Sequence, residues 1–193
     1  MNPIEILRDE HRLIEKVLDA LENYSQSIRN GAAVDYNDLR RFIQFIREFA
    51  DYCHHGKEED ILFEVMVENG FSLEQGPIAV MLAEHDEGRR LVGILSDAAE
   101  YGQSWTESDR RKVVEAALGY VELLRHHIKK EDFVLYPAAE ANLSASTMQG
   151  IGERFEKFEQ EETDPGKHEK FHKLAEELIS RYSNNSDQPK HHH

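Results

Sequence analysis

The sequence contains a single cysteine, Cys53, among 193 residues. One cysteine excludes an internal disulfide framework, and it argues against an iron–sulfur cluster or a zinc ribbon, because those sites need several thiolates. Proline and glycine are also scarce, with five and eleven residues. This composition is typical of a soluble helical domain and not of a disordered or collagen-like chain.

Long apolar runs and clustered positive charge are absent as well. No run approaches the roughly 20 apolar residues that a membrane helix needs, and the segment from Met1 to Asp9 lacks the basic start and apolar stretch of a signal peptide. The formal net charge is -15, whereas nucleic-acid binding needs a clustered basic surface. We therefore expect a cytoplasmic protein with neither a nucleic-acid partner nor a membrane partner.

The chain is expected to divide into three parts. Residues 1–141 would form the main helical domain, residues 142–183 a helical extension, and residues 184–193 a disordered tail. The last three residues, His191 to His193, look like a purification tag and are excluded from arguments about a site. Eight histidines remain, and their positions in the helical pattern carry the functional interpretation.

Four long amphipathic segments fill the first part. Apolar residues recur at alternating spacings of three and four, which places them on one stripe of a helix. The expected helices run from about residue 3 to 30, 36 to 68, 77 to 101 and 106 to 141, with two weaker ones at about 144–162 and 167–182. Short connections between long helices favour antiparallel neighbours. The sequence predicts an all-α fold: an antiparallel up-down-up-down four-helix bundle with two additional C-terminal helices.

Polar side chains interrupt the apolar stripe of each of the four long helices. His11 lies in the first stripe and His85 in the third. The second and fourth stripes each contain a histidine followed four residues later by a glutamate, so that both side chains lie on one face. These pairs are His54 with Glu58 and His127 with Glu131.

A metal site explains these residues better than a purely structural role does. A lone inward histidine is usually a hydrogen-bonded core residue, but four of them accompany two inward glutamates. An ionised carboxylate is costly to bury unless it is paired or bound to a cation. Mixed imidazole and carboxylate ligands suit iron better than calcium or magnesium. The pattern therefore predicts a metal site in the core of the bundle.

Four phrases in this order resemble the hemerythrin-like family over roughly residues 3 to 140. They are Asp9-Glu10-His11, Cys53-His54-His55-Gly56-Lys57-Glu58-Glu59, Glu84-His85-Asp86-Glu87 and His127-Ile128-Lys129-Lys130-Glu131-Asp132. No single phrase is specific, but their order on four helices is. The ferritin-like di-iron class instead uses Glu-x-x-His, a spacing that neither His-x-x-x-Glu phrase offers.

The resemblance implies two iron ions with an oxo or hydroxo bridge. Glu58 and Glu131 would then be bridging carboxylates, with His11, His54, His85 and His127 as terminal ligands. Invertebrate hemerythrins have a fifth histidine on the third helix, where this chain has Met81 or Arg89. Some hemerythrin-like domains use the residue after the second-helix histidine, so His55 is expected as the fifth.

The resemblance also implies the function classes. The leading expectation is a protein that binds dioxygen for sensing, storage or delivery. Oxygen carriers have an aspartate at five residues where this chain has Glu131 at four, and this departure weakens the case for simple carriage. The alternatives are a di-iron enzyme that acts on peroxide or nitric oxide, with an unknown electron donor, and an iron-responsive regulatory module. Glu59, Asp60 and Asp132 are expected to orient the histidines or to face water.

Overall fold

A computed structural model describes residues 2–102, 104–162 and 166–183 of the chain, and these residues form helices with no β-strand among them. The prediction of an all-α fold is confirmed over this part. The helical elements, in which η marks a π-helical segment, are α1 (Pro3–Arg29), α2 (Tyr36–Phe45), η1 (Ile46–His55), η2 (Glu58–Leu62), α3 (Phe63–Glu68), α4 (Pro77–Glu100), α5 (Glu107–Lys130), η3 (Glu131–Leu135), α6 (Tyr136–Asn142), α7 (Ala145–Glu162) and α8 (Lys167–Arg181).

Local signals determine where the long helices begin. The Asn2 side chain accepts a hydrogen bond from the Ile4 N–H, and Pro3 occupies the first turn, where its missing N–H has no consequence. Thr106 and Asp109 form a reciprocal capping box at the start of α5. These contacts satisfy backbone donors that have no partner inside the helix.

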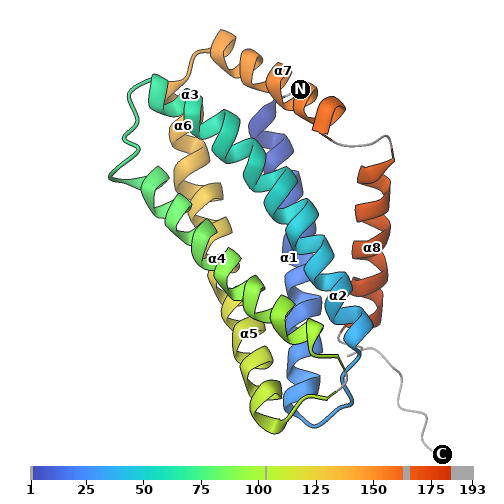
Figure 1. Ribbon diagram of the computed structural model, residues 1–193. Helices are drawn as coiled ribbons and strands as arrows, with labels where there is room; N and C mark the ends of the chain where they lie inside the picture. Colours follow the sequence, from blue (N-terminus) through green and yellow to red (C-terminus); the bar gives the residue numbers. More distant parts are fainter. Residues whose placement is uncertain (1, 103, 163–165, 184–193) are drawn as a thin grey trace, which may run out of the picture.

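The long helical segments lie side by side (Figure 1). Helix α5 contacts both α1 and α4, while α2 contacts α4, and η1 contacts both α1 and α4. Helix α7 lies across the end of the molecule near the N-terminus, and α8 runs along α1 and α2. The four long segments thereby enclose a common interior.

Two apolar clusters fill this interior, one on either side of a polar layer. One cluster contains Ile14, Phe49, Val92 and Leu124 with their neighbours, and the other contains residues such as Leu7, Ile61, Met81 and Leu135. On the first three long segments the histidines and glutamates singled out above lie between the residues of the two clusters, and on the fourth His127 and Glu131 stand on either side of Ile128, the last residue there of the first cluster. The polar layer is therefore sealed by hydrophobic packing at both ends.

The helices that carry the two His-x-x-x-Glu pairs are widened by π-helical turns. The Phe63 N–H bonds to the Glu58 carbonyl, and the Tyr136 N–H bonds to the Glu131 carbonyl, five residues back in each case. Pro137 follows directly and has no N–H to donate to a preceding carbonyl, so a regular α-helical ladder is broken there.

This widening changes which residues of the fourth helix face inward. A regular helical spacing continued from His127 and Glu131 would place Val134 on the inner stripe, but Val134 is 55% exposed and Leu135 is buried instead. The wide turn η3 moves the inward stripe on by one residue, from Glu131 to Leu135 and then to Ala139. Periodicity arguments assume a constant number of residues per turn, and here that number changes.

The C-terminal extension contributes to both apolar clusters. Ile151 and Phe155 of α7 join one cluster, and Phe171 and Leu178 of α8 join the other. Gly166, with φ of +89°, precedes α8. Residues 163–165, between the two expected C-terminal helices, and the expected tail at 184–193 lie outside the described residues. The division into domains at residue 141 stays a prediction.

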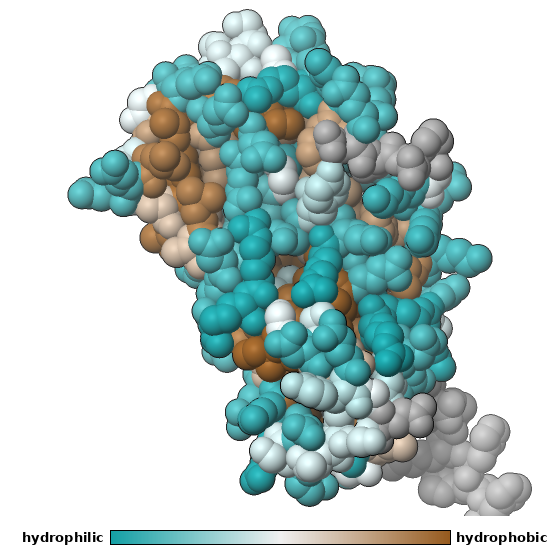
Figure 2. Space-filling model, in the orientation of Figure 1, coloured by the Kyte–Doolittle hydropathy of each residue, from teal (hydrophilic) through white to brown (hydrophobic). Residues whose placement is uncertain are grey.

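The visible surface is mostly hydrophilic, as expected for a chain with net charge -15 (Figure 2). Apolar side chains gather at the end where α3, α4 and α6 lie. Among the described residues the large exposed hydrophobic ones are Tyr52, Leu73, Val80, Tyr101, Phe133 and Val134. None of the described helices combines the length and apolarity that crossing a membrane requires.

Candidate metal centre

Seven buried side chains meet in the polar layer between the two apolar clusters. Each of the four long segments contributes at least one of them, and together they are His11, His54, His55, Glu58, His85, His127 and Glu131. These are the seven residues expected from the sequence pattern and the family resemblance. The structure brings all of them together, and their role as metal ligands remains a proposal.

The seven residues form two overlapping groups. In one, ligand atoms of His11, His54, Glu58 and Glu131 lie within 4.8 Å of one another, and in the other the two glutamates stand with His85 and His127. His55 is grouped with His85 and His127 within the same distance. We call His11 and His54 the two-histidine half and His55, His85 and His127 the three-histidine half. The two glutamates belong to both halves.

Every one of these histidines is held by a carboxylate at its Nδ1 atom. The Nδ1–O distances are 2.8 Å for His11 with Asp132, 3.0 Å for His54 with Glu10, 3.1 Å for His55 with Asp51, 2.9 Å for His85 with Glu59 and 3.1 Å for His127 with Glu84. We call these five acids the outer carboxylates. An ionised carboxylate only accepts hydrogen bonds, so each Nδ1 must carry the proton. A neutral imidazole then has its lone pair on Nε2.

Four outer carboxylates form a ring around the centre. Glu10 on α1 holds His54 of the second long segment, and Glu59 on that segment holds His85. Glu84 on α4 holds His127, and Asp132 on η3 holds His11 of α1. Each segment thus orients the ligand candidate of the next. The arrangement fixes both the rotation and the tautomer of the rings, as such carboxylates do in known metal sites.

Five of the atoms that face inward lack hydrogen-bond partners, while the Nε2 atoms of His85 and His127 lie 3.1 Å from each other. Both oxygens of Glu58, both oxygens of Glu131 and the Nε2 atom of His54 are buried and have no hydrogen bond among the described residues. The Nε2 atoms of His54 and His127 lie 2.6 Å and 2.9 Å from an oxygen of Glu58 and Glu131. Lone pairs therefore converge from several sides on one space. A buried carboxylate in such a position is costly without a cation.

Burial and mutual repulsion act on the charges of the two shared glutamates. Burial raises the pKa of Glu58, and the neighbouring Glu131 carboxylate raises it further. Burial by itself lowers the pKa of His54, but the charge of Glu58 and the hydrogen bond to Glu10 raise it to about 10. In the absence of a metal the centre thus holds protons, and binding a metal would release them.

Positively charged side chains pair with the outer carboxylates. Lys57 is buried, and its Nζ atom donates to Glu10 at 2.6 Å and also contacts Glu159 of α7. Burial raises the pKa of Glu10, but its hydrogen bond to His54 and the charge of Lys57 lower it to about 2. Arg89 donates to both Asp51 and Glu59. The outer carboxylates are accordingly held in their ionised form.

Sequence reasoning found some of these supporting residues and missed others. Glu59 and Asp132 hold histidines and Asp60 is exposed to solvent, which agrees with the expectation that these acids orient the histidines or face water. Glu10, Asp51 and Glu84 were not anticipated. For Glu10 and Glu84 the signal was adjacency, because four of the five outer carboxylates stand next to a ligand candidate in the sequence: Glu10 before His11, Glu59 after Glu58, Glu84 before His85 and Asp132 after Glu131.

Tyr136 is a further residue that the pattern missed. Its side chain is fully buried, its ring stacks on His11 at 5.4 Å between centroids, and its hydroxyl lies 3.3 Å from the His11 Nε2 atom. The hydroxyl thus contacts the same nitrogen that would bind a metal ion. Tyr136 therefore closes the two-histidine half on the side of α6.

A buried layer of histidines and carboxylates inside a helical protein is the arrangement that cation-binding helical proteins use. Residues 2–139 match the family described as hemerythrin HHE cation binding domain. The chain belongs to this family, and the resemblance noted from its sequence is confirmed.

Two of its relatives are the uncharacterized protein Rv1995 of Mycobacterium tuberculosis and the uncharacterized protein Mb2018 of Mycobacterium bovis. Each is 25% identical to this chain over 157 residues, which make up 80% of this chain and 59% of the relative. The chain thus spans about three-fifths of the length of these relatives. Their names state no activity, so the function of this chain has to be argued from its own site.

Proposed function

We propose that this protein holds two iron ions with an oxo or hydroxo bridge inside an antiparallel four-helix bundle, and that it binds dioxygen there. The observation that carries the proposal is the set of buried carboxylate oxygens without hydrogen bonds at Glu58 and Glu131. Two cations flanking this pair would satisfy all four oxygens at once. The roles of sensing, storage and delivery all require such reversible binding.

The donor set fits iron in particular. Five imidazoles and two carboxylates offer nitrogen and oxygen atoms, a mixture that suits iron better than calcium or magnesium. A structural zinc site would usually hold one tetrahedral ion, whereas here two groups of donors share the two glutamates. His11 and His54 would serve one ion and the three-histidine half the other.

The surrounding residues define what the bound ions could do. Reduced iron supplies electrons to an oxygen ligand, and this chain controls access to it. The two apolar clusters exclude water from both ends of the centre. The outer carboxylates keep each Nδ1 protonated, which leaves the Nε2 atoms available as ligands.

Metal analysis combined with absorption spectroscopy tests the proposal. The purified wild-type chain, with residues 191–193 removed, is analysed for metal and its spectrum is recorded after anaerobic reduction and again after exposure to air. We expect two irons per chain and visible bands that appear with oxygen and disappear reversibly. The Glu58→Gln variant serves as a control that keeps the side-chain shape but removes the shared charge.

The result separates the three function classes. Reversible bands without consumption of substrate support dioxygen binding, whereas steady turnover of peroxide or nitric oxide would identify an enzyme. A chain whose folding depends on iron but whose spectrum ignores oxygen would be an iron-responsive module. A fully folded chain that takes up no metal would overturn the proposal as a whole.

A further inference from the structure

Helix α7 of the C-terminal extension packs against the stretch of the second long segment that carries three ligand candidates, His54, His55 and Glu58. Phe158 of α7 lies against Gly56, and a Cβ atom added to that glycine would be 3.5 Å from Cζ of the phenylalanine ring. A helix outside the four long segments thus contacts the backbone between the ligand candidates.

A chain of polar contacts starts at His54 and reaches the extension. The His54 Nδ1 atom lies 3.0 Å from one oxygen of Glu10, and Lys57 donates to the other oxygen of Glu10 at 2.6 Å. The Nζ atom of Lys57 also contacts one oxygen of Glu159 on α7. The second oxygen of Glu159 contacts the Nε2 atom of His168 on α8. A candidate metal ligand is therefore linked to both helices of the extension by an unbroken series of contacts.

The charges along this chain alternate in sign. Lys57 is buried and has a carboxylate on either side, Glu10 from α1 and Glu159 from α7. Burial raises the pKa of Glu159, but its hydrogen bond to His168 and the charge of Lys57 lower it below its usual range. A buried cation is costly unless anions pair with it. The charge of Lys57 therefore joins the extension to the metal centre.

Apolar packing between α1 and α7 is interrupted beside these residues. A cavity of about 650 Å³ lies there, and its lining includes Glu10, Lys57, Glu159 and His168. The polar contacts thus span a place where hydrophobic contact is missing. Because Lys57 is buried, separating it from Glu159 would leave a charge partly uncompensated, which costs more than breaking a surface ion pair.

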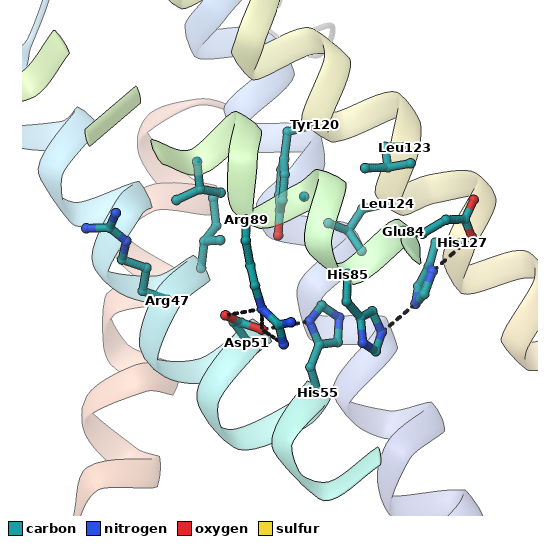
Figure 3. A pocket seen from close by; sticks show the side chains of 13 residues that line it. Arg47, Asp51, His55, Glu84, His85, Arg89, Tyr120, Leu123, Leu124 and His127 are labelled. Carbon is teal, nitrogen blue, oxygen red and sulfur yellow. Dashed lines mark hydrogen bonds and ion pairs between the residues drawn. The ribbon is translucent and has the colours of Figure 1, made fainter. Parts of the chain in front are cut away.

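The cations beside the other outer carboxylates belong to the four long segments and pair with carboxylates of those segments. Arg89 of α4 pairs with two outer carboxylates, as Figure 3 shows for Asp51. Arg12 of α1 and Lys130 of α5 pair with one outer carboxylate each. Lys57 differs from these three, because its second carboxylate comes from α7. The extension is thereby connected to the two-histidine half in particular.

We propose that Glu159 is a positioning residue of the metal centre. It holds Lys57 and, through Lys57, it holds Glu10, which orients His54. Without the charge of Glu159, Lys57 acts on Glu10 alone, and Glu10 then polarises the imidazole less. Iron in the two-histidine half and α7 docked on the bundle accordingly stabilise each other. The proposal rests on the proposed function, because the coupling needs an ion at His54.

The iron affinity of the full chain, measured by competition with a chelator, is the first readout. Glu159→Gln keeps the shape of the side chain and removes its charge. We expect its dissociation constant for iron to rise about fivefold, less than the roughly 10- to 100-fold expected for an acid that holds a ligand directly. Glu156→Gln, at an exposed position on the same helix, is the matched control and should bind iron like the wild type.

Hydrogen exchange of the α7 amides, measured with and without iron, is the second readout. Iron should slow this exchange about fivefold more in the wild type than in Glu159→Gln, because coupling between linked equilibria is reciprocal. A merely structural role would make α7 of the variant exchange faster by the same factor with and without iron, and that result would overturn the proposal. The wild type decides even if the variant folds poorly, since α7 exchange that does not respond to iron would contradict the coupling.

Failure of the coupling and failure of the iron centre give different results. If the wild type held two irons and Glu159→Gln bound them with equal affinity, the coupling would be wrong and the proposed function would stand. If the folded wild type took up no iron, the proposed function would be overturned, and the contacts of Glu159 would serve only to dock α7.

Discussion

The two halves of the centre differ in their donors and in their access. The two-histidine half has two imidazoles and is closed by Tyr136, whose hydroxyl already contacts His11. The three-histidine half has one imidazole more and borders a cavity. The shared glutamates join halves with different numbers of imidazoles, so that two ions in this site would not be chemically equivalent.

Their supporting residues differ in a similar way. Next to the two-histidine half, the buried Glu10 accepts a hydrogen bond from Lys57, and Lys57 also contacts Glu159 of α7. Behind the three-histidine half, Asp51 and Glu59 share the partly exposed Arg89. The support is therefore buried on one side of the centre and partly exposed on the other.

Removing a shared carboxylate should have the largest effect, because it breaks both halves together. In Glu58→Gln we expect metal content to fall close to zero and the stabilisation by metal, about 4 kcal/mol when iron is at 1,000 times its dissociation constant, to be lost. The metal-free form should become more stable by about 1 kcal/mol, because the repulsion between the buried carboxylates of Glu58 and Glu131 is gone. Urea unfolding with and without iron measures both changes.

Opposite signs in the two states are the essential result of that experiment. If Glu58→Gln lowered the free energy of unfolding equally with and without iron, the role of Glu58 would be structural and would not depend on metal.

Removing a single histidine should distinguish the halves. His11→Ala takes one of only two imidazoles, and we expect about one iron per chain to remain. His55→Ala takes one of three, and the side chain is grouped with His85 and His127 but with neither glutamate. That variant should keep two irons with weaker binding. Metal analysis after extensive dialysis measures the difference, and equal losses in the two variants would contradict the asymmetry.

Neutralising an outer carboxylate should weaken metal binding by about 10- to 100-fold without removing a ligand. Glu10→Gln should lie at the upper end of this range, because it also leaves buried Lys57 with one partner fewer. Glu84→Gln, on the other half, should lie at the lower end. Competition with a chelator measures both affinities. If both variants lost the same amount of metal affinity, burial of the outer carboxylate would have no effect on metal binding.

The smallest effect concerns pH. The pKa of Glu10 is lowered to about 2 in the folded chain, so its contribution to stability is present above about 4.5 and is lost as the pH falls towards 2. We expect the metal-free chain to lose about 2 kcal/mol of unfolding free energy over this interval from Glu10. In Glu10→Gln the free energy of unfolding should depend less on pH over this interval. Denaturant melts from pH 2 to pH 6 provide the measurement, and an unchanged slope would argue against the ion pair.

Much of the fold and of the candidate site could be predicted from periodicity and local signals. Apolar spacing located the four long helices, and polar residues inside the stripes pointed to His11, His54, His85 and His127 with Glu58 and Glu131. His55 came only from the family resemblance, because on a regular helix it lies to one side of the stripe. The π-helical segment η1 ends at His55, and both neighbouring histidines face the interior.

The sequence by itself determined which residues are available for chemistry and on which helices they lie, because helical spacing is a local property. Only the tertiary structure decided how they are paired. Four of the five outer carboxylates hold a histidine on a different long segment, and Gly88 meets Tyr120 across two helices. Such contacts depend on the rotation of each helix about its own axis. That rotation is decided by packing in the two apolar clusters and by the wide turns near Glu58 and Glu131.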